Sequence, residues 1–163
     1  MTNIQQPFHQ QRYRSVPEAW QHGFNPEFWR WGLVFNQGNE MSVSKERVQE
    51  RLKYIASKLL REMYGNQYRE KAKIQCLAVQ HGSLESANRH FHVLVGIESD
   101  EIPWSDFRIR TAIEKYDRKI CCPWEKPVHV DYDWELGNRY HSYVTRYLQS
   151  RNADNAEWFA LKI

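Results

Sequence analysis

Long apolar segments are absent from this 163-residue chain, and cysteine is scarce. No run of about 18 apolar residues occurs, so we expect no membrane span. The polar start, MTNIQQPFHQQRYR, has no apolar core of the kind that a secretory signal contains. The three cysteines, Cys76, Cys121 and Cys122, include no Cys-x-x-Cys pair, which argues against a disulfide framework. Together these absences predict a reduced, cytoplasmic protein without a membrane partner.

A phosphate-binding loop is missing too. The chain has no Gly-x-x-x-x-Gly-Lys-[Ser/Thr] motif, so we expect no ATPase or helicase domain in it. Internal repeats and long linkers are also absent, and the length suits one domain. We therefore expect a single domain at residues 29–163, preceded by an arm or lead-in at residues 1–28.

Charge of one sign is not in large excess. The 23 Lys and Arg residues exceed the 20 Asp and Glu residues by a net charge of +3, which suits a nucleic-acid partner without requiring one. The hydrophobic content of 41% is typical of a globular domain and excludes wholesale disorder. The aromatic residues, 7 Trp, 9 Tyr and 7 Phe, include enough rings for stacking on unpaired bases, although most aromatic residues belong to cores.

The clearest periodic segment predicts a helix over residues 42–64. Ser42 or Ser44 can cap its start, and Gly65 follows its end. Its apolar residues recur every three or four positions and form one stripe: Val48, Leu52, Ile55, Leu59 and Met63. The charged residues off this stripe are expected to form a solvated outer face: Lys45, Glu46, Arg51, Lys58 and Arg61.

The remaining pattern predicts alternating strands and helices. Strands are expected at residues 31–35, 74–80, 90–96 and 127–132, and further helices at residues 105–116 and 139–151. The resulting order, β-α-β-β-α-β-α, predicts an α+β fold. In it an antiparallel sheet carries its helices on one face, as in a ferredoxin-like arrangement.

Two histidines alternate with apolar residues in the predicted strand at residues 90–96. Side chains alternate along a strand, so His90 and His92 share one face, about 6–7 Å apart. Phe91 and Val93 point to the other face, where helices can cover them. Two neutral imidazoles on one face can converge on a metal ion.

A third ligand is expected just upstream. We favour Gln80, at the end of the preceding strand, with His81 and Glu85 as the alternatives. A Gln oxygen and two imidazoles would leave a neutral, open site suited to Mg²⁺ or Mn²⁺. His129, in the last predicted strand, is either a group near this site or a plain surface histidine.

A row of tyrosines lies on the predicted helix at residues 139–151. Tyr143 and Tyr147 are one turn apart and share a face, with Arg139 and Arg146 beside them. Tyrosine is a poor nucleophile at its reference pKa of about 10. A nearby cation and a metal-polarised phosphodiester would favour its attack. The alternative is an aromatic stripe that only packs.

This order of motifs resembles the HUH endonucleases, named for His-hydrophobe-His, and among them the rolling-circle replication initiators. The likeness covers roughly residues 30–150. Three segments carry the resemblance. The family's first strand motif resembles Trp31-Gly32-Leu33-Val34-Phe35, and its metal-binding motif resembles Arg89-His90-Phe91-His92-Val93-Leu94-Val95. Its paired-tyrosine motif resembles Tyr143-Val144-Thr145-Arg146-Tyr147. The chain departs from the family pattern at Gln80, where an acidic ligand is usual, and at Arg146 and Ser150, where lysines are usual.

The resemblance implies a metal-dependent, site-specific endonuclease and strand transferase that acts on single-stranded DNA. Tyr143 would be the primary nucleophile and would form a 5′-phosphotyrosine intermediate. Tyr147 would be either a second nucleophile or a packed neighbour, and Arg146 would be the adjacent cation. The implied role is initiation of rolling-circle replication of a phage or plasmid. The implied partners are a single-stranded origin, with or without a hairpin, and a helicase of the host or element. Two alternatives stay open: a transposase of hairpin-flanked elements and a non-catalytic ferredoxin-like nucleic-acid-binding domain.

Overall fold

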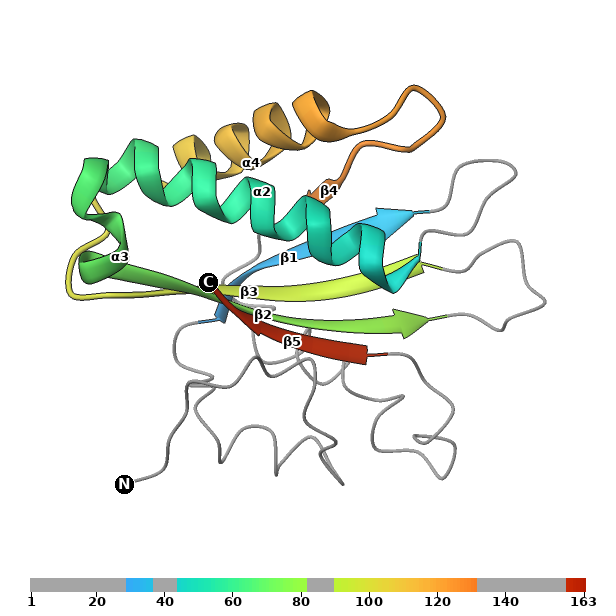
Figure 1. The fold of residues 1–163 in the computed structure, drawn as a ribbon, viewed down its shortest axis with the longest axis horizontal. Helices are drawn as coiled ribbons and strands as arrows, with labels where there is room; N and C mark the ends of the chain where they lie inside the picture. Colours follow the sequence, from blue (N-terminus) through green and yellow to red (C-terminus); the bar gives the residue numbers. More distant parts are fainter. Residues whose placement is uncertain (1–28, 37–43, 82–89, 132–157) are drawn as a thin grey trace.

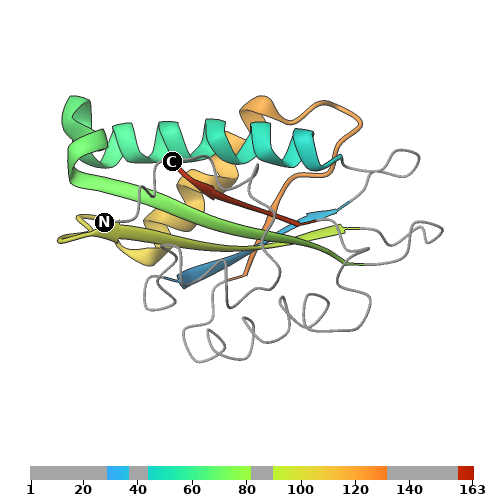
Figure 2. The same cartoon turned by 60° about the horizontal axis from the view of Figure 1, so that its bottom comes forward.

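The computed structural model describes residues 29–36, 44–81, 90–131 and 158–163. These residues form a five-stranded antiparallel sheet with the strand order β4-β1-β3-β2-β5. Helices α2 and α4 pack side by side over one face of it (Figures 1 and 2). The strands are β1 (Trp29–Asn36), β2 (Ala72–His81), β3 (His90–Ser99), β4 (His129–Asp131) and β5 (Trp158–Lys162). The helical segments are α2 (Lys45–Tyr64), η3 (Gly65–Gln67), α3 (Tyr68–Lys71) and α4 (Asp106–Ile120).

The predicted α+β class, antiparallel sheet and helical layer are confirmed for this part of the chain. Some details differ. Helix α4 continues to Ile120 rather than ending near residue 116, and β3 continues to Ser99 rather than ending at residue 96. The edge strand β5 and the short helical segments η3 and α3 were not predicted. The expected arm at residues 1–28 and the expected helix at residues 139–151 lie outside the described residues. None of the described helices is long and apolar enough to cross a membrane.

Helix α2 begins and ends at the residues that its sequence indicates. Ser44 caps the start, where its hydroxyl accepts a hydrogen bond from the Arg47 amide at 3.1 Å. Gly65 ends the helix with φ at 66°, a conformation that favours glycine. The predicted apolar stripe is buried against the sheet, with Val48, Leu52, Ile55, Leu59 and Met63 all in the hydrophobic core.

The expectation that Arg51 belongs to a solvated outer face is wrong. Its side chain is fully buried and forms two hydrogen bonds with the equally buried Asp117 of α4, at 2.8 and 2.7 Å. Its guanidinium also lies over the Phe35 ring, 4.8 Å from the ring centroid. Asp117 in turn accepts a hydrogen bond from the Val128 amide at 2.7 Å. This ion pair therefore joins α2 and α4 to the segment that leads into β4.

A second arginine of α2 holds the turn after α4. Arg47 donates two hydrogen bonds to the Glu125 carboxylate, at 2.7 and 2.9 Å, and one to the Ile120 carbonyl at 2.7 Å. Glu125 also accepts a hydrogen bond from the Cys122 amide at 2.7 Å. The hydrogen bonds from Arg47 are the main reason that the pKa of Glu125 is lowered to about 2. The ionised carboxylate is thus part of the folded structure.

This shift predicts an acid-dependent loss of stability. A carboxyl group whose pKa falls on folding stabilises the fold fully above its ordinary value, here 4.5, and loses that contribution as the pH falls towards about 2. Glu125→Gln should therefore lower the free energy of unfolding by about 2 kcal/mol near neutral pH, allowing for partial screening. In urea unfolding curves, the difference from the parent protein should shrink steadily below about pH 4.5. A difference that stays constant between neutral and strongly acid pH would contradict this role.

Candidate metal centre

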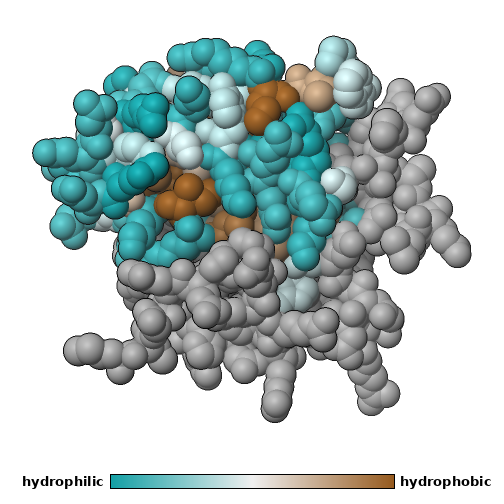
Figure 3. Space-filling model, in the orientation of Figure 1, coloured by the Kyte–Doolittle hydropathy of each residue, from teal (hydrophilic) through white to brown (hydrophobic). Residues whose placement is uncertain are grey.

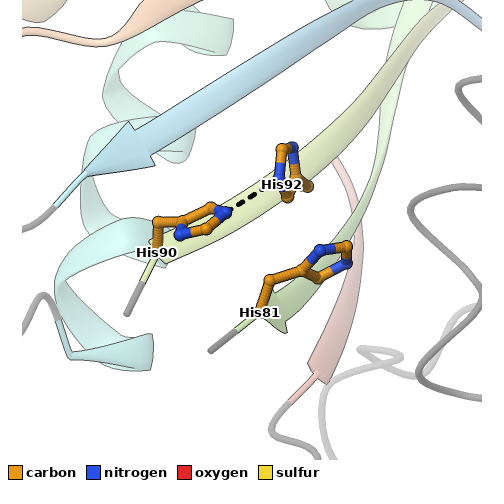
Figure 4. Close-up of side chains that lie close together, drawn as sticks. All are labelled: His81, His90 and His92. Atoms are coloured by element: carbon orange, nitrogen blue, oxygen red, sulfur yellow. Dashed lines mark hydrogen bonds between the residues drawn. The ribbon is translucent and has the colours of Figure 1, made fainter. Parts of the chain in front are cut away.

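Three histidines gather where β2 ends and β3 begins (Figure 4). His81 lies directly opposite His90 in the antiparallel pairing of the two strands, and His92 is two positions further along β3. Opposed residues share a face of a sheet, as do residues two apart on one strand. The intervening Phe91 belongs to the core beneath the helices. The register therefore brings all three imidazoles to the face that α2 and α4 do not cover.

The three rings are close enough to share one ion. Their ligand nitrogens all lie within 4.8 Å of one another. The Nε2 atoms of His90 and His92 are 2.9 Å apart and share a hydrogen bond, and the ring centroids of His81 and His92 are 4.4 Å apart. Two nitrogens each about 2.1 Å from one ion lie about 3.0–3.4 Å apart. The spacing of His90 and His92 thus needs little change to accommodate a shared ion.

Burial differs among the three side chains. His81 is 2% exposed and His92 7% exposed, whereas His90 is half-buried. Burial holds the first two rings in position, and His90 connects the cluster with the surface. Among the described residues, these three form the one group of His, Cys, Asp or Glu side chains whose geometry suits a metal ion.

The structure does not place Gln80 with the histidines. Gln80 pairs with Phe91, whereas His81 pairs with His90. Gln80 therefore lies on the opposite face of the sheet, in phase with the core residues Cys76 and Ala78 of β2. The preferred third ligand of the sequence interpretation is thus replaced by one of its alternatives, His81. The other alternative, Glu85, lies outside the described residues.

The neighbouring strands define the surroundings of the cluster. Val34 of β1 pairs with His92 on one side and with His129 of β4 on the other. His129 therefore lies in the same cross-strand row as His92, two strands away, or roughly 10 Å by ordinary strand spacing. Its side chain is exposed. His129 shares the histidine face but is too distant to be a ligand of the same ion.

The donor set determines which ions fit. Three neutral imidazoles suit Zn²⁺, Mn²⁺, Co²⁺ or Ni²⁺, and three protein ligands leave room for further oxygen ligands. Mg²⁺ prefers oxygen ligands and was expected partly because of the Gln80 amide oxygen. Since His81 takes that place, the cluster fits a transition metal better than Mg²⁺.

The expected nucleophiles are not part of the described structure. Tyr143, Tyr147 and the cations Arg139 and Arg146 all lie between residues 132 and 157, outside the described ranges. Their position relative to the histidines stays a prediction from the sequence. Comparison of the chain with protein-family models, curated proteins and solved structures returned no match in any of the three, so the histidine cluster is the feature on which a function can be argued.

Proposed function

We propose that the chain is a metal-dependent nuclease of the HUH type, which nicks and rejoins single-stranded DNA through a tyrosine. The observation that carries the proposal is the His81–His90–His92 cluster, whose ligand nitrogens lie within 4.8 Å of one another. Both histidines of the His-Phe-His motif belong to it, on one face of the central strand β3. The strand order β4-β1-β3-β2 and its antiparallel pairing also favour the ferredoxin-like arrangement of that family.

The histidines would hold a divalent transition metal. A bound ion of this kind would polarise a phosphodiester and stabilise the charge that develops on its oxygens. His81 and His92 are held by burial, so their rings are fixed before a substrate arrives. His90 is half-buried and is the most exposed ring of the three.

The proposed reaction exchanges one phosphodiester bond in the DNA for another between the DNA and a tyrosine. The phenolate oxygen of Tyr143 attacks the phosphorus atom and forms a bond to it, while the bond from phosphorus to the 3′ oxygen breaks. The 3′ oxygen takes up a proton and leaves as a free hydroxyl, and the 5′ phosphate stays joined to the tyrosine. Arg146 favours the phenolate form by its charge. A later attack by a 3′ hydroxyl reverses these steps and reseals the strand.

A covalent-adduct assay tests this proposal. The full chain is incubated with Mn²⁺ and a library of labelled single-stranded oligonucleotides, then separated on a denaturing gel. A heat-stable protein–DNA band is expected that disappears with EDTA and with Tyr143→Phe, which removes only the nucleophilic oxygen. Tyr147→Phe is the matched control and should retain the band.

The outcomes separate the open alternatives. A full-strength adduct in Tyr143→Phe would show that another residue is the nucleophile. If the parent protein forms no adduct while still binding metal and DNA, a non-catalytic nucleic-acid-binding domain is the better interpretation. Cleavage only next to a hairpin that flanks a mobile element would favour the transposase.

A further inference from the structure

Helix α4 turns a basic, aromatic face away from the sheet. Its buried side consists of Ile109, Ala112, Ile113, Tyr116 and Asp117. The remaining side carries five cations: Arg108, Arg110, Lys115, Arg118 and Lys119. Only two carboxylates, Asp106 and Glu114, accompany them, because Asp117 is buried with Arg51. This face alone has an excess of positive charge as large as the net +3 of the whole chain.

Exposed aromatic rings lie near both ends of α4 in the sequence. Phe107, in the first turn of α4, is 79% exposed, and Trp124, just beyond the end of the helix, is 66% exposed. They are the two large hydrophobic side chains most open to water in the described part of the chain. Beside Phe107, the guanidinium of Arg108 lies 3.9 Å from the centroid of the Trp104 ring. The side of the helical layer that Figure 3 shows is mainly hydrophilic, with a few hydrophobic patches.

We propose that the outer face of α4 from Phe107 to Lys119, together with Trp124, binds single-stranded nucleic acid. Lysine and arginine side chains attract phosphates, and exposed rings stack on unpaired bases regardless of sequence. The helix is about 22 Å long, enough to follow several successive nucleotides. A duplex could use the cations but offers the rings no unpaired base. The combination therefore fits a single strand.

This surface is separate from the histidine cluster. The core residues Phe91 and Val93 of β3 point towards the helices, whereas His90 and His92 alternate with them and point the other way. The sheet thus lies between the two sites. Binding at α4 does not depend on the proposed nuclease activity, and both features can be tested independently.

The test is an anisotropy titration of fluorescent oligothymidylate with the full chain in EDTA, which prevents metal-dependent cleavage. For a single strand, each lost phosphate contact reduces the slope of log K against log salt by about 0.7. Lys115→Gln/Arg118→Gln should therefore reduce the slope by about 1.4 and weaken binding. Phe107→Ala should weaken binding about tenfold without changing the slope. A duplex of similar length should bind less tightly than the single strand.

The matched control is Lys53→Gln/Lys58→Gln, which removes two exposed cations from α2 in the same helical layer. It should leave both affinity and slope near the parent values. An unchanged slope in Lys115→Gln/Arg118→Gln would overturn the proposal, and so would an equal loss in the α2 control. Full affinity in Phe107→Ala would overturn the assignment to single strands. None of these results depends on adduct formation, so this proposal and the nuclease can fail separately.

Discussion

His81→Ala should lower the affinity of the chain for Mn²⁺ or Zn²⁺ more than about 100-fold. Loss of a residue that only hydrogen-bonds to a metal ligand already costs about 10–100-fold in affinity, and loss of a ligand itself should cost more. His81 lies opposite His90, with its ring centroid 4.4 Å from that of His92. Removing it leaves two imidazoles and, among the described residues, no third His, Cys, Asp or Glu donor in reach of the same ion. Isothermal titration with each ion measures the effect directly. His90→Ala, at a half-buried position, should give a similar loss with less disturbance of packing.

The neighbouring Gln80 provides the control. It is adjacent in sequence but lies on the other face of β2, opposite Phe91. Gln80→Met keeps the side-chain volume and should leave metal affinity within about threefold, an energy difference well under 1 kcal/mol. A large loss in Gln80→Met, or full affinity in both His81→Ala and His90→Ala, would show that the ligand set is not the three histidines.

Asp117→Ala should lower the free energy of unfolding by about 3–5 kcal/mol, the usual effect of removing one partner of a buried ion pair. Both side chains of the Arg51–Asp117 pair are 0% exposed. Without Asp117, the guanidinium of Arg51 stays buried without its counter-charge, and the Val128 amide loses its acceptor. Urea denaturation at neutral pH measures the change.

An exposed ion pair on the same helix provides the control for the buried pair. Arg110 and Glu114 lie 3.4 Å apart, with side chains 44% and 33% exposed. Glu114→Ala should cost at most about 0.5 kcal/mol, since exposed pairs of this spacing contribute little. Arg51→Met/Asp117→Leu should recover part of the loss, because an apolar pair leaves no buried charge. Equal effects of Asp117→Ala and Glu114→Ala would contradict the role assigned to the buried pair.

Local periodicity predicted most of the described fold. The stripe on α2, its cap at Ser44 and the alternation of His90 and His92 with apolar residues all depend on neighbours within a few positions. Such signals are visible in one sequence. The antiparallel α+β class followed from the order of these segments, and the structure confirms it.

The wrong predictions concern side chains whose position is determined by contacts with residues far away in the sequence. In β2 both faces are apolar, with Ile74, Cys76 and Ala78 on one and Leu77 and Val79 on the other. The sequence pattern therefore did not show which of Gln80 and His81 faces the metal motif; only the pairing with β3 decides it. Likewise Arg51 is buried because Asp117, far along the chain, neutralises it. No local pattern reveals such a partner.

The strand order also has a consequence for how the chain folds. In the described sheet, β2 and β3 are the one pair of neighbouring strands that follow each other along the chain. Every other pairing, such as Val34 with His129 or Cys76 with Leu161, must close a long loop first. Contacts between nearby segments form faster than distant ones. We therefore expect the hairpin that carries all three histidines to form early, so that a metal ion can stabilise a folding intermediate before the outer strands have joined the sheet.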